Sequence, residues 1–172
     1  MNLKWILIIY HNGIPLFGYD VENKKSLLDE NTRMLEKMGG FYNVMTYCNH
    51  FLLDYPVTSI LMGGLFWVMH NEIITHYNPR EIIKYSVILV TEINKNHIEL
   101  GNSNVGITIA EYEKVLLQFA REISLDFYSE CAEEIQAFVL LNTTMFNRFK
   151  VYCDNKIEIL VAQLTEALVK AD

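Results

Sequence analysis

The chain has 172 residues, 51% of them hydrophobic and 12% aromatic, which is enough to fill the core of one soluble domain without a disulfide or a metal. Its formal net charge is −7 and it contains no run of Lys and Arg, which argues against binding to nucleic acid or directly to anionic lipid. No stretch of 18 apolar residues is present, so we expect no transmembrane segment and a single domain over residues 1–172.

The first predicted element is a β-hairpin. Leu3 to Tyr10 is an apolar run interrupted only by Lys4, and the turn His11-Asn12-Gly13 separates it from a second run over Ile14 to Asp20. A strand that is apolar on both faces is typical of the centre of a sheet that is covered on both sides. Pro15 has no N–H group, which places the second strand at an edge or Pro15 at its start.

A polar connection over Val21 to Asn31 precedes a predicted amphipathic helix from about Thr32 to Asp54. The apolar residues that recur at helical spacing are Met34, Met38, Phe41, Met45, Cys48 and Leu52. Gly39-Gly40 interrupts this pattern and has two interpretations. We favour an irregular first turn with the regular helix starting at about Gly40; the alternative is close packing of the backbone against the sheet.

The next segments predict more strands. Val57 to Met62, Gly63-Gly64 and Leu65 to His70 form either a tight hairpin or one long strand with a glycine bulge. Residues from about 71 to 84, which include Asn78-Pro79, are expected to form an extended connection with helical character around Glu81 to Lys84. A strong strand over Tyr85 to Ile93 follows this connection.

Helices are predicted over about residues 108–170. Thr108 to Glu111 matches a capping box, and the last helix covers about Met145 to Lys170. Their apolar stripes contain Tyr112, Val115, Leu116, Phe119, Ile123 and Phe127, and then Phe149, Cys153, Ile157, Leu160, Leu164 and Leu168. The element order β-β-α-β-β-β-α-α predicts an α+β fold, in which helices pack on a five-stranded antiparallel sheet.

This order, with several short strings, resembles longin and roadblock-type (SNARE-like) domains. The hairpin over residues 5–17 resembles the opening of these domains, and residues 39–51 followed by 59–64 resemble the helix and hairpin of archaeal-style members. Residues 90–96 together with 149–152 are similar to segments of the small subunits of clathrin-adaptor complexes. The connection over 71–84 and the C-terminal helices exceed a minimal roadblock domain, which favours a longin-like fold.

The resemblance implies a non-enzymatic, cytoplasmic protein-binding platform in membrane trafficking or small-GTPase regulation. It implies a homodimer or heterodimer whose partner is a small GTPase or another longin-like chain, with membrane association at most peripheral and through that partner. The longin strand order would put the strand over Val57 to Met62 at an edge, where pairing with a partner or ordinary edge protection are both open. The candidate partner-binding residues are Val57, Thr58, Ile60, Met62, Phe66 and Trp67, and an exposed Phe66 or Trp67 would act as an anchor.

No catalytic, metal-binding or cofactor-binding residues are predicted. The sequence has no GxGxxG or GxxxxGK[ST] loop for phosphates, no HExxH spacing among its five histidines, and no GxSxG around a serine. Cys48 and His50 are two positions apart on a predicted helix and therefore face different directions. The three cysteines lack CxxC spacing and are expected to be reduced thiols. The alternative function is a small-ligand sensor of PAS- or GAF-like shape, with an enclosed cavity lined by Met and Phe.

Overall fold

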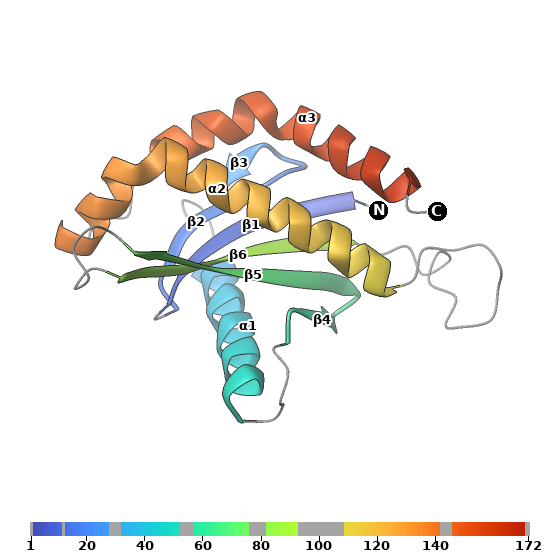
Figure 1. Cartoon of the computed structure of the whole chain (residues 1–172), viewed down its shortest axis with the longest axis horizontal. Helices are drawn as coiled ribbons and strands as arrows, with labels where there is room; N and C mark the ends of the chain where they lie inside the picture. The colour runs from blue at the N-terminus through green and yellow to red at the C-terminus, as the bar shows by residue number, and fades with distance from the viewer. Residues whose placement is uncertain are drawn as a thin grey trace.

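The computed structural model describes residues 2–11, 13–27, 32–51, 57–75, 82–92, 109–141 and 146–170. The elements in chain order are β1 (Asn2–Tyr10), β2 (Pro15–Asp20), β3 (Lys25–Ser26), α1 (Thr32–Phe51), β4 (Ser59–Met62), β5 (Leu65–Thr75), β6 (Ile82–Glu92), α2 (Ile109–Leu141) and α3 (Asn147–Lys170). The strands form one sheet in the order β3-β2-β1-β6-β5-β4, and every neighbouring pair is antiparallel (Figure 1). The predicted α+β class with an antiparallel sheet is therefore confirmed.

The sheet has six strands, so the predicted number of five is wrong. The additional strand, β3, lies inside the segment that the sequence predicts as a polar connection. Asp20 accepts a hydrogen bond of 2.9 Å from the Asn23 N–H, and Lys24 takes a positive φ of 52°, so the chain reverses and pairs with β2. A strand of two polar residues, Lys25 and Ser26, has no hydrophobic period by which the sequence could reveal it.

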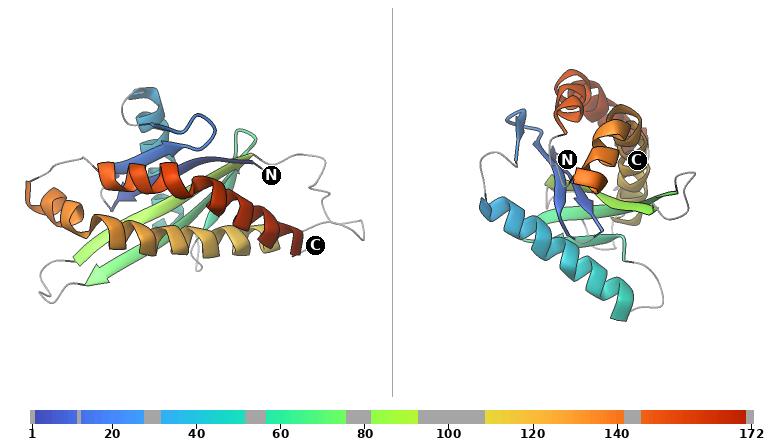
Figure 2. Two further views of the ribbon diagram at one scale, coloured as in Figure 1. Left: turned by 90° about the horizontal axis from the view of Figure 1, so that it is seen from above. Right: turned by 90° about the vertical axis from the view of Figure 1, so that its left-hand side faces the viewer.

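Helices cover both faces of the sheet. α1 packs on one face, and α2 and α3 lie across the other (Figures 1 and 2). β1 lies between β2 and β6 at the centre, as its apolar run predicts. Its residues Ile6 and Ile8 belong to the core under α2 and α3, whereas Leu7 and Ile9 belong to the core under α1. Both layers of the fold thus meet at β1.

The β4–β5 segment is a hairpin and not one bulged strand. Gly63 and Gly64 have φ values of 62° and 78° and form the tight turn between the two strands. The predicted connection over 71–84 is wrong at both ends, because β5 continues to Thr75 and β6 begins at Ile82, where helical character was expected. The polar residues His70, Asn71 and Glu72 interrupt the apolar pattern of β5, so the sequence does not show that the strand continues beyond His70. Residues 76–81, including Asn78-Pro79, lie outside the described residues.

α1 is a continuous helix from Thr32 to Phe51, so both interpretations of Gly39-Gly40 are wrong. Apart from the helix's own backbone, a Cβ atom built on either glycine would meet no atom of the described residues within 4 Å, so the backbone of α1 is not closely packed against the sheet there. α2 has 33 residues with a kink at Cys131, and α3 begins at Asn147. Thr108 of the predicted capping box and residues 52–54 of the first predicted helix lie outside the described residues.

Candidate protein-binding site

β4 is the outer strand at one end of the sheet. It pairs with Leu65 to Val68 of β5 on one side, and no other strand of the described residues pairs with its other side. Leu61 and Met62 are 57% and 41% exposed, respectively. Because successive side chains of a strand point to opposite faces, these two residues make the strand apolar on both faces of the sheet. The edge position expected for Val57 to Met62 is found, although the strand begins only at Ser59.

Phe66 and Trp67 are both buried, each with 3% exposure, so neither forms the exposed anchor that the sequence left open. Phe66 belongs to the core under α2 and α3. Trp67 lies on the opposite face, where its ring stacks on Phe41 of α1 at a centroid distance of 4.5 Å and meets Trp5 at 6.1 Å. The alternation of aromatic residues in β5 indicates two faces, but it does not reveal that a helix covers each of them.

The residues before β4 are held by side chains from both helical layers. The Asn49 side chain of α1 accepts a hydrogen bond from the Val57 N–H and donates one of 3.3 Å to the Val57 carbonyl. The Thr58 hydroxyl donates to the carboxylate of Glu113 in α2, and the Thr58 carbonyl accepts a hydrogen bond of 2.8 Å from the Met69 N–H. Val57 and Thr58 therefore position the edge strand.

Of the six predicted residues, only Met62 is an exposed apolar side chain at the edge. Val57 and Ile60 are partly buried and pack against the core under α1. Sequence reasoning missed Leu61, the most exposed apolar residue of the edge strand, and the role of Asn49. The position of Leu61 in the predicted hairpin was a signal for exposure at an edge. The pairing of Asn49 with Val57 depends on the tertiary packing of α1 and has no such signal.

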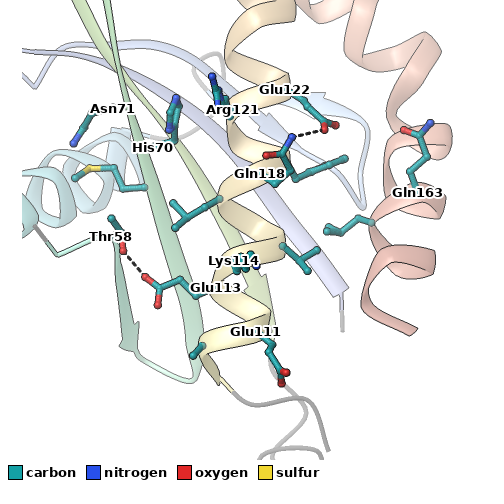
Figure 3. A pocket seen from close by; sticks show the side chains of 16 residues that line it. Thr58, His70, Asn71, Glu111, Glu113, Lys114, Gln118, Arg121, Glu122 and Gln163 are labelled. Atoms are coloured by element: carbon teal, nitrogen blue, oxygen red, sulfur yellow. Dashed lines mark hydrogen bonds between the residues drawn. The ribbon is translucent and has the colours of Figure 1, made fainter. Parts of the chain in front are cut away.

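An open groove runs between this end of the sheet and α2 (Figure 3). Its lining comprises Thr58, Met69, His70 and Asn71 from the sheet side, Ala110, Glu111, Glu113, Lys114, Val115, Leu117, Gln118, Phe119, Arg121 and Glu122 from α2, and Gln163 and Leu164 from α3. The groove is open and partly lined by charged side chains. It therefore differs from the enclosed cavity lined by Met and Phe that a small-ligand sensor requires.

A polar network beside the groove joins β5 and β6 to α2. The Ser124 Oγ atom lies 3.2 Å from Glu72 Oε2 and 3.1 Å from the Tyr85 hydroxyl, and that hydroxyl donates a bond of 3.0 Å to the Ser124 carbonyl. Burial raises the pKa of Tyr85. Glu72 Oε2 also lies 3.3 Å from His70 Nε2, so the carboxylate contacts both the serine and the histidine. In a Ser-His-Asp triad the histidine contacts the serine directly, and here the Glu72 carboxylate takes that place.

Neither a metal site nor a membrane-spanning helix is found within the described residues. No group of three or more His, Cys, Asp or Glu side chains among them is arranged to hold a metal ion. None of the described helices is both long and apolar enough to cross a membrane. Cys131 and Cys153 are buried and form no disulfide within the described residues, and burial raises the pKa of Cys153. These two thiols are packing groups of the core under α2 and α3.

Comparison of this chain with models of protein families, with curated protein sequences and with solved structures finds no match. The similarity to longin and roadblock-type domains therefore stays an expectation based on the short strings and the element order. The geometry of β4 and of the neighbouring groove is the basis for assigning a function.

Proposed function

We propose that this chain is a non-enzymatic protein-interaction domain of longin-like type that pairs with a partner chain through β4. The observation that carries the proposal is the exposed apolar pair Leu61 and Met62 on an outer strand. An outer strand presents unpaired N–H and C=O groups, and another strand can add to them by β-augmentation. The partner is a small GTPase or another longin-like chain, in a homodimer or a heterodimer.

The way in which β4 is held supports the proposal. Asn49 binds the backbone of Val57, and Glu113 accepts a hydrogen bond from Thr58, so the strand is fixed from both faces of the sheet. A strand that is already ordered loses little conformational entropy when a partner adds to it. An apolar strand edge held in place in this way is suited to forming an intermolecular sheet.

The test uses Leu61→Asp with Ile159→Asp as its matched control. Ile159 of α3 is 58% exposed, so both variants place a carboxylate at an equally accessible apolar position. The tagged chain is co-purified from its native source and bound proteins are identified by mass spectrometry, while self-association is followed by analytical ultracentrifugation. We expect Leu61→Asp to weaken association by about tenfold or more and Ile159→Asp to leave it unchanged.

Two results would overturn the proposal. One is a strict monomer at high concentration that recovers neither a GTPase nor a second longin-like chain. The other is equal loss of association in both variants, because a specific strand edge predicts that only Leu61→Asp disturbs the interface. Circular dichroism of each variant confirms that it is folded before association is compared.

A further inference from the structure

The outer side of β4 presents the backbone groups of two residues. The Met69 N–H donates a hydrogen bond of 2.8 Å to the Thr58 carbonyl, so Thr58 directs its carbonyl toward β5. Because backbone direction alternates along a strand, Ser59 and Leu61 direct their N–H and C=O groups to the outer side. No strand of the described residues pairs with that side. The hairpin turn follows Met62, so Leu61 is the last outward residue before the turn.

A side chain of α1 closes this row of outward groups at its other end. By the same alternation Val57 is the next outward residue, but Asn49 binds both of its backbone groups. The amide oxygen of Asn49 accepts a hydrogen bond from the Val57 N–H, and the amide nitrogen donates one of 3.3 Å to the Val57 carbonyl. An added antiparallel strand would make the same two kinds of bond. Asn49 therefore takes the place of a neighbouring strand at Val57.

Both faces of the short open edge are apolar. Leu61 is opposite Phe66 in the register, so it lies on the face of α2 and α3, and it is 57% exposed. Ile60 is opposite Trp67, so it lies on the face of α1, where it is partly buried. The third residue, Ser59, is small and uncharged. A partner strand would therefore meet apolar side chains on both faces of the sheet and no charge in β4.

We propose that β4 binds a short apolar strand of a partner protein in antiparallel register, with three consecutive residues opposite Leu61, Ile60 and Ser59. The first and the third of these residues exchange backbone hydrogen bonds with Leu61 and Ser59. The side chains of the first and the second pack on Leu61 and Ile60. The partner strand ends or turns after its third residue, because Asn49 already binds Val57. The inference rests on the proposed function and names the register, length and character of the segment that binds.

The probe is a fluorescein-labelled synthetic peptide, Lys-Thr-Val-Val-Thr-Gly-Lys, in which the two valines and the threonine after them face Leu61, Ile60 and Ser59. N-methylation of the first valine removes the N–H group that would donate to the Leu61 carbonyl. N-methylation of the second valine is the matched control, because its N–H group points away from β4. Binding of the three peptides to the full chain is measured by fluorescence anisotropy.

We expect methylation of the first valine to weaken binding about tenfold and methylation of the second valine to leave it unchanged. Equal effects of the two methyl groups would contradict the register. Leu61→Asp should also weaken binding of the unmethylated peptide, whereas Ile159→Asp, which makes the same change on α3, should not. The two lysines are present in every peptide, so attraction to the net negative charge of the chain cancels from these comparisons.

The end of the edge at Val57 has its own test. A longer peptide, Lys-Thr-Val-Val-Thr-Val-Val-Lys, would place its last valine opposite Val57 in the same register. We expect N-methylation of that last valine to leave the affinity unchanged, because Asn49 holds the backbone groups of Val57. A loss of about tenfold would show that the strand displaces Asn49, and it would overturn the predicted end of the edge.

Hydrogen exchange of individual backbone amides is an independent measurement. The Ser59 and Leu61 amides should exchange rapidly in the free chain and about tenfold more slowly in the complex with the first peptide. The Val57 amide should be protected in both states, because Asn49 accepts its hydrogen bond. The Ile60 amide, which points to β5, is the internal reference. Rapid exchange at Val57, or unchanged exchange at Ser59 and Leu61 in the complex, would contradict the inference.

Failure of this inference is distinguishable from failure of the proposed function. Suppose that no peptide binds at millimolar concentration, or that the methyl groups act equally, while Leu61→Asp still loses the partner recovered from the native source. The inference about register and length is then wrong, and pairing through β4 stands. If Leu61→Asp instead keeps both the partner and the peptide, pairing through β4 is itself wrong.

Discussion

β3 and β4 are the two outer strands of the same sheet, and the residues next to them are joined to helices in different ways, by an ion pair beside β3 and by hydrogen bonds beside β4. Lys24, next to β3, forms an ion pair of 2.5 Å with Glu158 of α3. The Tyr19 hydroxyl in β2 donates a hydrogen bond of 2.6 Å to Asp154 of the same helix. β3 itself has two residues, one of them the exposed Lys25. Short length and an exposed lysine are common protection against unwanted strand pairing.

β4 lacks this protection. Its four residues are Ser-Ile-Leu-Met, and the last two are exposed. The side chains that hold the chain at this end, Asn49 and Glu113, bind the residues before the strand, and no strand in the described part of the chain pairs with the outer side of β4. The comparison suggests that one edge is kept from pairing while the other is kept available for it.

The largest expected effect concerns the hydrogen bonds between Asn49 of α1 and Val57, which precedes β4. Asn49→Ala removes both hydrogen bonds to Val57 and leaves two backbone groups of a partly buried residue without that partner. We expect the free energy of unfolding to fall by about 1–2 kcal/mol, measured by urea denaturation. The matched control is Asn23→Ala near β3, where an exposed side-chain bond to Asp20 is lost and the change should stay within about 0.5 kcal/mol. Equal losses would contradict the difference between the two edges.

A smaller effect is expected at the bond between Tyr19 and Asp154. Tyr19→Phe should lower the free energy of unfolding by about 1 kcal/mol at neutral pH. Burial alone would raise the pKa of Asp154, but hydrogen bonds from Tyr19 and Lys150 outweigh it and hold that pKa below its ordinary value of 3.8.

The pH dependence of this effect follows from the lowered pKa. The stabilisation from ionised Asp154 is fully present above its ordinary pKa of 3.8 and is lost as the pH falls through the lower folded value. The difference in stability between the wild type and Tyr19→Phe should therefore shrink below about pH 4. Denaturation curves at several acidic pH values measure it, and a difference that grows toward low pH would contradict the assignment.

The smallest effect is expected for Lys24→Ala. Lys24 and Glu158 are 51% and 79% exposed at their side chains, so water and salt screen their attraction. We expect no change in the free energy of unfolding beyond experimental error. The short length of β3 and the exposed Lys25 remain in this variant, so we also expect self-association to stay unchanged. New dimerisation in ultracentrifugation would instead show that the Lys24 ion pair protects this edge.

The parts of the fold with a strong apolar pattern were predictable from the sequence. The run over Leu3 to Tyr10 correctly indicated a central strand covered on both sides, and the described side chains of the predicted stripes of α2 and α3 lie in or against the core. The side chains of Leu160 and Leu168, which the prediction also included, lie outside the described residues. β3 and the full length of β5 were not predictable. β3 has no apolar period, and the alternation of β5 is broken by Glu72. The Glu72 carboxylate contacts His70 of the same strand and accepts a hydrogen bond from Ser124 of α2, and only the tertiary structure supplies the second contact.

The candidate site was predictable only as a strand. The sequence pointed to residues 57–67, but exposure depends on what covers each face, and α1 covers Trp67 while α2 and α3 cover Phe66. β5 continues to Thr75 whereas β4 pairs only with Leu65 to Val68, so no strand among the described residues pairs with the outer side of Asn71 and Ile73. The sequence placed these two residues in a connection, so it could not indicate a strand edge there.

The stacked position of Trp67 has a practical consequence for measurement. The chain has two tryptophans, Trp5 and Trp67, and their rings lie 6.1 Å apart on the α1 face of the sheet. Phe41 of α1 covers the Trp67 ring. Separation of α1 from the sheet would expose both indole rings to water and shift their fluorescence emission to longer wavelength. Intrinsic fluorescence therefore reports the packing of α1 on the sheet, while circular dichroism reports the helical content of α1, α2 and α3 together. Comparing the two signals during unfolding would reveal whether α1 separates from the sheet first.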